Sequence, residues 1–548
     1  MPYNPAPMAV LPRLYDYGAF REPPSRLFLD YLNELPGATS FFAGGWSLDA
    51  LAVAADRARS LPRPREAVAT ALVRQQEARG AVKSAETAAR LRDPHAVAVV
   101  TGQQAVLFGG PALVLYKALA VLKIAAQLEG RTGAPVIPVF WVASDDHDFE
   151  EVRSVELVDP DGALRQLRYV PAGDPSGQPT SNIVLDASVE ALLGELQGTL
   201  AESAARDDLL VQVTSCYRPG TSLAEAFARL VSSLLPGLVV LDPADPALKS
   251  LLAPVLRREV EEASPTSRLA ASVGPALEAA GYHEQVAVRE GFLNAFVTVD
   301  GARRALGLHN GSVEVRGTER RLAVADALAW LEREPTAFSP NALLRPLLQD
   351  AILPTAAYVG GPAEVAYHAQ IGPSYQHFGI PRPALVPRPG ATLVEPAQVR
   401  ALEAEGLGLA DLQQDPDALL ARWARESHPG VEEAFVAARA AIERELLAVG
   451  DALGRADPTL RAAADAAKGR ALHQVEGLQE KALRALKKGD RVRADRLRRT
   501  RETLFPGGDP QERRLAFVSW IARWGRSVVD VVAERLDPFA RAHQVITL

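Results

Sequence analysis

The chain of 548 residues contains a single cysteine, Cys216. One cysteine excludes an intrachain disulfide. It also excludes a cysteine-rich zinc site and leaves histidine and carboxylate side chains as the remaining choice of metal ligands. No apolar run reaches the ~18 residues that a membrane-spanning helix requires. The nearest such run, around 118–126, is interrupted by Lys123.

Basic residues are not in excess: 60 Lys and Arg face 67 Asp and Glu, for a net charge of −7. This balance argues against nucleic acid as a general partner. The first 18 residues lack a basic stretch followed by an apolar one, so we expect no secretory signal, no membrane partner and a cytoplasmic location. The length predicts three or four domains or subdomains.

Three common motifs are also absent: a G-x-x-x-x-G-K-[ST] loop, a G-x-G-x-x-G turn and a G-x-S-x-G elbow. By motif, the chain is therefore not a P-loop ATPase, an ordinary dinucleotide enzyme or an α/β-hydrolase.

The most informative stretch is 96–151, which predicts strand, turn, helix and strand in succession. A short apolar strand at 97–100 is followed by two turns, and Pro111 then opens a helix to about 129. Glycine beside a helix N-terminus lets a ligand approach unpaired backbone N–H groups. We therefore take these turn residues as candidates for ligand binding: Gly102, Gln103, Gln104, Phe108, Gly109 and Gly110.

The second strand of this stretch, 136–142, ends in a cluster of four titratable side chains: Asp145, Asp146, His147 and Asp148. Acidic residues in the first turn of a helix are ordinary partners of its dipole. Four such groups after a buried strand are nevertheless costly without a cationic ligand. Ligands of parallel sheets bind beyond the carboxyl ends of the strands. We predict carboxylates that hold an ammonium group or a metal-bound phosphate, and His147 as a general base.

Further candidates lie on the predicted helices and strand ends. Lys117 follows Tyr116 in the second turn of the first helix, and it is either a phosphate ligand or a surface lysine. A second Gly-Gly-Pro turn follows a strand at 355–359. One such turn in each half of the sheet is what two mononucleotide-binding halves that face one crevice would show. An arginine in such a crevice forks onto carboxylate or phosphate. The additional candidates are Tyr116, Lys117, Asn341, Arg345, Gln349, Tyr358, Gly360, Gly361, Glu364 and Arg388.

Two insertions interrupt the predicted sheet. The second holds three short strands joined by Asp300-Gly301 and Asn310-Gly311, which are strong hairpin signals. We divide the chain into a first half of the core at 1–154, a first insertion at 155–215, a continuation of the core at 216–284, a small β insertion at 285–335, a second half of the core at 336–398, a helical domain at 399–506, and a C-terminal helix docked on the core at 507–548.

The helical domain is rich in Ala, Arg, Glu and Leu. Candidate helices at 431–455, 459–487 and 490–503, with a break at Asp457-Pro458, predict a helical hairpin or short coiled coil. The run 484–501 holds nine Lys or Arg against two Asp, and we favour a solvated helix face over nucleic-acid binding. A last helix at 511–537 carries an apolar face that includes Phe517, Trp520, Ile521, Trp524 and Val528.

Four long segments carry a resemblance to a known family: TGQQAVLFGGPALVLYK, PVFWVASDDHDFEEV, SPNALLRPLLQDAILPTAAYVGGPAEVAYHAQI and FGIPRPALVPRPGATLVE. Together with LFPGGDPQER at 504–513, they closely resemble the cysteine ligase family of bacillithiol biosynthesis, the BshC family. The similarity is collinear and covers essentially the whole chain.

The resemblance implies an α/β fold with a Rossmann-like nucleotidyltransferase core, two connective insertions and a C-terminal coiled-coil domain that forms a homodimer. It implies the last step of bacillithiol synthesis, in which L-cysteine is joined to the amine of glucosaminyl-malate. ATP and Mg²⁺ would form a cysteinyl adenylate. Helix N-termini at Pro111 and Pro362 would bind phosphate or carboxylate, cations would neutralise charge, and the acidic cluster would orient or deprotonate the amine.

The chain departs from related enzymes at two points. The paired histidines by which class I synthetases bind ATP are missing from the first helix, so a different activating donor stays open. No cysteine-based zinc site exists to select the thiol. Two other functions remain: a glycosyl- or nucleotidyltransferase acting on a sugar nucleotide, and a non-catalytic dimeric scaffold in thiol metabolism.

Overall fold

The computed structural model describes residues 12–288, 291–489 and 491–548. Part of the N-terminal segment expected to carry no secretory signal, residues 1–11, lies outside the described residues. The described chain forms two compact units. The core unit comprises 12–394 and 510–548, and the helical unit comprises 395–509.

The core unit is built on a sheet of five parallel strands in the order β13-β12-β2-β3-β6. Val, Ile, Leu and aromatic residues fill these strands and are almost wholly buried, as expected when helices cover both faces of a parallel sheet. The strand order reverses between β2 and β12, which confirms the predicted Rossmann-like arrangement. The strands are β2 (Val97–Gln103), β3 (Val136–Val142), β6 (Val239–Leu241), β12 (Thr355–Gly360) and β13 (Ala384–Pro387).

Helices pack against this sheet. The crossover helix α6 (Ala112–Thr132) is apolar on most sides and contacts β2, β3 and β12. It ends at Gly133, whose left-handed backbone closes the last turn. The other covering helices are α3 (Leu48–Arg59) on β12, α4 (Arg65–Ala78) and α5 (Val82–Ala89) on β6, and α15 (Pro362–Gln370) on β12 and β13.

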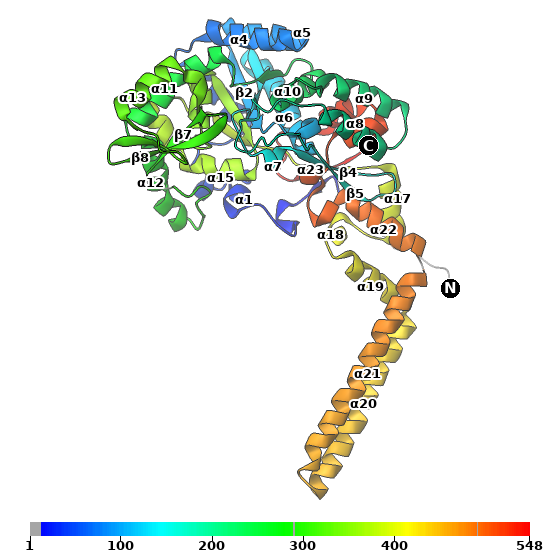
Figure 1. Cartoon of the computed structure of the whole chain (residues 1–548). Coiled ribbons are helices and arrows are strands. Elements are labelled where there is room, and N and C mark those ends of the chain that lie inside the picture. Colours follow the sequence, from blue (N-terminus) through cyan, green and yellow to red (C-terminus); the bar gives the residue numbers. More distant parts are fainter. Residues whose placement is uncertain (1–11, 289–290, 490) are drawn as a thin grey trace. The chain divides into compact units, whose positions relative to one another are not determined.

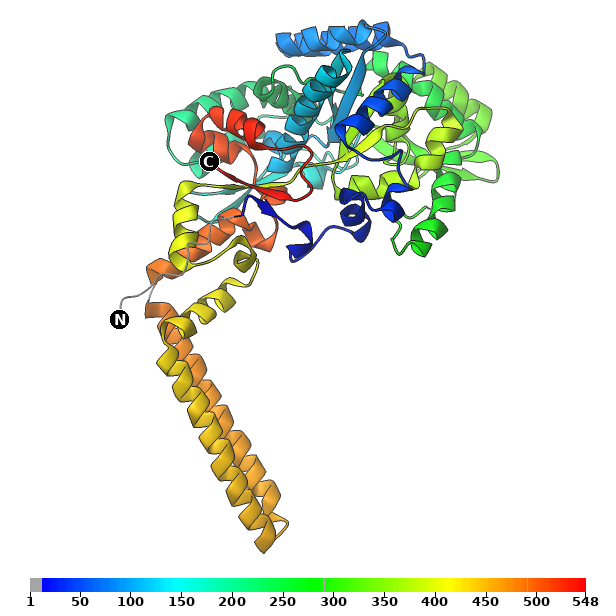
Figure 2. The same ribbon diagram turned by 180° about the vertical axis from the view of Figure 1, so that it is seen from behind.

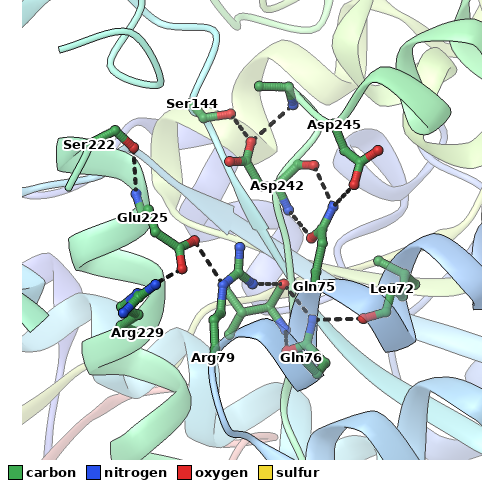
Figure 3. A network of polar contacts seen from close by, with 12 residues as sticks. Leu72, Gln75, Gln76, Arg79, Ser144, Ser222, Glu225, Arg229, Asp242 and Asp245 are labelled. Atoms are coloured by element: carbon green, nitrogen blue, oxygen red, sulfur yellow. Dashed lines mark hydrogen bonds and ion pairs between the residues drawn. The ribbon is translucent and has the colours of Figure 1, made fainter. Parts of the chain in front are cut away.

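Side chains of α4 pair with the backbone of β6, the strand at one end of this sheet (Figure 3). Gln76 donates to the carbonyl of Val240 at 2.9 Å and accepts from its N–H at 3.2 Å. Gln75 repeats the pattern on Asp242, at 3.0 and 2.9 Å. The two amides therefore satisfy backbone groups that an unpaired strand edge would leave open.

The first insertion follows β3 and contains a two-stranded hairpin and helices. A short helix leads directly from the acidic cluster into the hairpin, which is antiparallel. The elements are α7 (Phe149–Val152), β4 (Ser154–Val158), β5 (Leu164–Arg168), α8 (Ser188–Thr199) and α9 (Ala204–Cys216).

The second insertion is a five-stranded antiparallel sheet in the order β10-β9-β8-β7-β11, with two more strands than the sequence predicts. Positive φ angles at Asp300-Gly301 and Asn310-Gly311 confirm the two predicted hairpin turns. The strands are β7 (Phe292–Val299), β8 (Ala302–His309), β9 (Ser312–Val315), β10 (Arg321–Ala323) and β11 (Phe338–Pro340). The helices of this part of the chain are α10 (Leu223–Leu234), α11 (Pro246–Glu261), α12 (Pro265–Ala279), α13 (Val324–Arg333) and α14 (Arg345–Ile352).

The predicted single helix at 511–537 is wrong. Three short helices occupy this segment, and Trp524 is 40% exposed although Trp520 is buried. The backbone leaves the helix because Leu515 accepts from the N–H of Ala112 and Ala516 donates to the carbonyl of Glu156. The helices are α23 (Gln511–Arg514), α24 (Val518–Trp524) and α25 (Ser527–Arg535).

The C-terminal strand β15 (His543–Thr547) returns to the core unit. It lies between β1 (Leu14–Tyr15) and β14 (Ala391–Val394), which Figure 2 shows as a red strand beside the blue start of the chain. Residues from both ends of the sequence thus share one small sheet.

The helical unit contains two long helices that run side by side, α20 (Pro429–Ala456) and α21 (Leu460–Gly489) (Figure 1). With 28 residues, α20 is about 42 Å long at the ordinary helical rise. Asp457 accepts from the N–H and hydroxyl of Thr459 and closes the turn between them. This confirms the predicted hairpin. The shorter helices are α17 (Pro396–Glu405), α18 (Leu409–Leu412), α19 (Pro416–Ser427) and α22 (Arg491–Leu504). None of the described helices combines the length and apolar character needed to cross a membrane.

Candidate active site

The core unit contains a cavity of about 790 Å³ at the carboxyl ends of β2 and β12, where the strand order reverses. This is the position at which open α/β sheets bind their ligands. We call it the switch-point cavity. Its wall is formed by strand ends, the first turns of α6 and α15, the start of α14, the β4–β5 hairpin and α23.

Glycines keep the floor of the cavity open. A Cβ atom on Gly102 would lie 3.2 Å from the carbonyl oxygen of Trp141 and 3.5 Å from the hydroxyl of Tyr358. A larger residue would therefore push against the neighbouring strand. Gly361 precedes Pro362 at the first position of α15, and proline loses no hydrogen bond there.

Lys117 and Glu364 form a buried ion pair across the switch point, with Nζ and Oε2 2.5 Å apart. The ammonium also donates to the carbonyl of Gly102 at 2.9 Å and to the side chain of Gln103 at 3.0 Å. Burial lowers the pKa of Lys117, and Glu364 opposes that effect. Burial would raise the pKa of Glu364, but Lys117 and hydrogen bonds from Tyr358 and Gly361 hold it below its ordinary value. The Lys117 side chain is only 4% exposed, so Lys117 is not a surface lysine.

Arg345, which is half-buried, is the second cation of the wall. One guanidinium nitrogen donates to the hydroxyls of Tyr358 and Tyr367, each at 3.1 Å, and another donates to Gln349 at 2.9 Å. Burial alone would lower the pKa of Arg345, but Tyr358, Tyr367 and Glu364 keep it above its ordinary value. The head group is thus charged and held by neutral partners, which leaves its charge available to an anion.

Arg388 is the third cation of the wall, and it donates to Glu512 of α23 at 2.6 Å. Its backbone N–H donates to the carbonyl of Gly360 at 2.8 Å, which fixes it beyond the end of β13. Arg513 also lines the cavity and is exposed, whereas Arg514 pairs with Glu156 of β4. Cations therefore gather around the starts of α14 and α15 and along α23.

Carboxylates occupy the part of the wall that follows β3. Gln104 donates from one amide nitrogen to Asp146 at 2.6 Å and to Glu151 at 2.8 Å. Burial raises the pKa of Glu151; the bond from Gln104 lowers it, and Asp148 and Asp146 raise it further. The cavity thus has a cationic region and an anionic region, which suits a substrate pair with anionic and cationic groups.

The four residues of the predicted acidic cluster separate in the structure. Only Asp146 lines the switch-point cavity. Asp145 pairs with buried Lys249 at 2.6 Å, His147 contacts a guanidinium nitrogen of Arg303 at 3.0 Å, and Asp148 caps α7. These three side chains are therefore engaged elsewhere.

His147 does not have the environment of a strong base. Burial lowers the pKa of His147, and the neighbouring charge of Arg303 lowers it further, against the opposing effect of Asp146 and Asp148. Arg303 comes from β8 of the second insertion and also donates to the carbonyl of Pro340 at 2.6 Å. The second insertion thus orients the loop after β3.

The structure brings half of the predicted site residues together. Those that line the cavity are Gly102, Gln103, Gln104, Lys117, Asp146, Arg345, Tyr358, Gly361, Glu364 and Arg388. The others do not line the cavity: Phe108, Gly109, Gly110, Tyr116, Asp145, His147, Asp148, Asn341, Gln349 and Gly360.

The turn Phe108-Gly109-Gly110 packs against protein and does not face the cavity. Phe108 is buried edge-on against Tyr217, and a Cβ on Gly110 would lie 3.0 Å from Val106. The positive φ angles of this turn explain its glycines instead. Tyr116 is wholly buried on α6.

Two further predicted residues contact Arg345: the carbonyl of Asn341 accepts from its backbone N–H at 2.9 Å, and Gln349 binds its side chain. Asn341 accepts from the N–H groups of Leu343 and Leu344 before α14 and donates to Asn294 of β7 at 2.6 Å. Gln349 is buried one turn beyond Arg345 and fixes its head group. Both lie beside the cavity wall and not on it.

Several residues of the wall were not predicted from the sequence. Glu151 follows the acidic cluster by three positions, and the acidic doublet Glu150-Glu151 was the available signal. Arg513 ends the segment LFPGGDPQER that carries part of the resemblance, and Arg514 follows it directly. Glu156 and Gln166 come from the β4–β5 hairpin, where alternating polar residues gave no indication of a site.

A family model described as Bacillithiol biosynthesis BshC, N-terminal Rossmann-like domain, matches residues 16–389. A second, described as Bacillithiol biosynthesis BshC, C-terminal coiled-coil domain, matches residues 391–548. The chain belongs to the BshC family. It is thus a member of a ligase family, as its motifs predicted.

Three relatives are named "Putative cysteine ligase BshC". The Salinibacter ruber protein is 34% identical, over 98% of this chain and 100% of the relative. The Koribacter versatilis protein is 36% identical over 93% and 95%, and the Chlorobaculum tepidum protein 32% over 98% and 99%. The similarity therefore extends over both units.

Proposed function

We propose that the protein ligates the carboxyl group of L-cysteine to the amine of glucosaminyl-malate, the last step of bacillithiol synthesis, through a cysteinyl adenylate. The observation that carries the proposal is the switch-point cavity with its cationic and anionic regions, in a chain whose full-length relatives are named cysteine ligases. A free carboxylate must be activated before an amine displaces its oxygen, and ATP is the simplest activating donor.

The cationic region suits the anionic groups of such a reaction. Lys117, Arg345 and Arg388 surround the first turn of α15, whose unpaired N–H groups also favour phosphate or carboxylate. Charge develops on the departing phosphate as an acyl adenylate reacts, and fixed cations stabilise it without reorganisation. The anionic region around Asp146 suits the ammonium form of the acceptor amine.

Mg²⁺ would enter with the phosphates of the nucleotide. Within 12–288, 291–489 and 491–548, no group of three or more His, Cys, Asp or Glu side chains is arranged to hold a metal ion. Mg²⁺ usually keeps several waters and binds through substrate phosphates and one or two carboxylates. Its role would be to offset phosphate charge while the residues above orient the substrates.

We further propose a homodimer formed by the helical unit. Val436 and Leu447 of α20 lie eleven positions apart, about three helical turns, and are 52% and 43% exposed. Such apolar positions on a long helix favour contact with a second helix. Sedimentation of wild type and of V436E/L447E tests this: wild type as a dimer and the variant as a helical monomer are expected, and a monomeric wild type would contradict it.

The ligase proposal is tested by incubating the purified chain with glucosaminyl-malate, cysteine, ATP and Mg²⁺ and measuring the cysteinyl amide by mass spectrometry. Product is expected only in the complete mixture. R345M should abolish it, whereas R333M, which removes an exposed arginine from α13, should not. Amide formation without a nucleotide, or turnover of a sugar nucleotide without cysteine, would refute the proposal.

A further inference from the structure

The acceptor amine must lose protons to become an amide. Three of the residues that the sequence indicated as possible proton acceptors are engaged in other contacts in the structure. This inference rests on the proposed function. Asp145 is bound to Lys249, His147 to Arg303, and Asp148 to the first turn of α7. None of the three lines the switch-point cavity.

Glu151 does line the cavity, and its carboxylate lies beside that of Asp146. Both accept from the same nitrogen of Gln104, at 2.8 and 2.6 Å. The amide must present its NH₂ group to them, since its oxygen would face two acceptors. Among the described residues, no lysine, arginine or histidine lies within ion-pair distance of Glu151. The nearest cationic candidate to Asp146 is the ring of His147 at 3.7 Å.

The backbone holds this pair of carboxylates in place. Asp146 accepts from the N–H of His147 at 2.7 Å, and its carbonyl accepts from the N–H of Thr180 at 2.8 Å. Asp148 caps the N–H of Glu151 itself at 3.2 Å. Ser144, just before the cluster, is hydrogen-bonded to Asp242 beyond β6 (Figure 3). The positions of Asp146 and Glu151 are therefore set by the fold.

We propose that Glu151 is the general base for the acceptor amine, and that Asp146 and Gln104 position the amine beside it. The ammonium form binds between the two carboxylates. Glu151 takes one proton from it and releases this proton to water. The neutral nitrogen then attacks the carbonyl carbon of the acyl adenylate, and a C–N bond forms. The bond from that carbon to the adenylate oxygen breaks, its electron pair leaves with AMP, and the second proton of the nitrogen passes to Glu151.

Local charges favour this role. Glu151 is an exposed residue. Partial desolvation still raises the pKa of its carboxyl, the hydrogen bond from Gln104 lowers it, and the carboxylates of Asp148 and Asp146 raise it further. A base whose pKa lies closer to the working pH accepts a proton more readily in the transition state. Asp146 lies before α7, and its carboxylate accepts from the same nitrogen of Gln104 as that of Glu151. We therefore assign Asp146 to binding the amine.

The experiment separates the two half-reactions in E151Q. Cysteine-dependent exchange of pyrophosphate into ATP reports activation, and mass spectrometry reports amide formation. E151Q should keep exchange within about twofold and lose about 10²- to 10⁴-fold in amide formation. E151D should recover part of the loss. The matched control is E150Q, which removes the neighbouring charge from an exposed residue bound to Arg153.

A pH profile distinguishes a base from a merely structural residue. The rate of amide formation in wild type should fall at acidic pH as Glu151 is protonated, and D146N should move this limb to lower pH. E151Q should lose the limb. Equal losses of exchange and amide formation in E151Q, or an unchanged acidic limb, would overturn the inference. A wild type that performs neither half-reaction would overturn the proposed function, and this inference with it.

Discussion

The ion pair between Lys117 and Glu364 gives a quantitative prediction for the variant K117M. The two side chains are 4% and 20% exposed. The ammonium donates hydrogen bonds to Glu364, Gln103 and the carbonyl of Gly102. Removing one partner of a buried pair costs about 3–5 kcal/mol because the other charge is left buried. Glu364 keeps hydrogen bonds from Tyr358 and Gly361, so we expect about 3 kcal/mol for K117M.

The double variant K117M/E364Q decides whether the buried charge is the cause. Replacing the orphaned carboxylate by a neutral amide should recover about 2 kcal/mol relative to K117M. Urea unfolding followed by circular dichroism measures both. The matched control is K123M on the same helix, whose ammonium binds the carbonyls of Ala533 and Leu536 and no carboxylate. E364Q should not rescue K123M. A double variant less stable than K117M would refute the reasoning.

Three further predictions follow. Because Lys117 holds the pKa of Glu364 below its ordinary value, Glu364 stabilises the fold above the ordinary carboxyl range and loses this effect as pH falls through its folded pKa. The urea midpoints of wild type and K117M should therefore converge as the pH falls below about 4.3, and parallel curves there would contradict this. Q76L should lower stability by about 2 kcal/mol, because the buried N–H of Val240 loses its partner, whereas the carbonyl of Val240 keeps its bond from Arg79 at 2.6 Å. The exposed control Q127L should change stability little. R513A should raise KM for the carboxylate-bearing acceptor about tenfold and leave KM for cysteine unchanged, and the reverse pattern would place the acceptor elsewhere.

Local patterns predicted much of the fold because they depend on neighbouring residues. The buried strand β3 matches its predicted range, since a short run of β-branched and aromatic residues before a polar cluster has few alternatives. Asp-Gly and Asn-Gly fixed both hairpins of the second insertion. The break at Asp457-Pro458 divided the long helices. The segment at 511–537 failed because distant backbone groups of Ala112 and Glu156 draw Leu515 and Ala516 out of a helix.

The site was harder to predict because its contacts join distant residues. Lys117 meets Glu364 across 247 positions, and Arg388 meets Glu512 across 124. Asp146 and Gln104 were predicted to lie near one another because each follows a strand and the carboxyl ends of parallel strands meet at one edge of the sheet. Both line the switch-point cavity. The engagement of Asp145 by Lys249 of α11 and of His147 by Arg303 of the second insertion joins residues more than 100 positions apart, which no local pattern encodes.

The most direct test of the central claim uses cysteine with ¹⁸O in its carboxyl group, together with ATP, Mg²⁺ and glucosaminyl-malate. If the switch-point cavity activates cysteine as an adenylate, the products are the cysteinyl amide and AMP, and mass spectrometry will find one ¹⁸O atom in the AMP. Amide accompanied by unlabelled AMP, or no amide at all, would contradict the account.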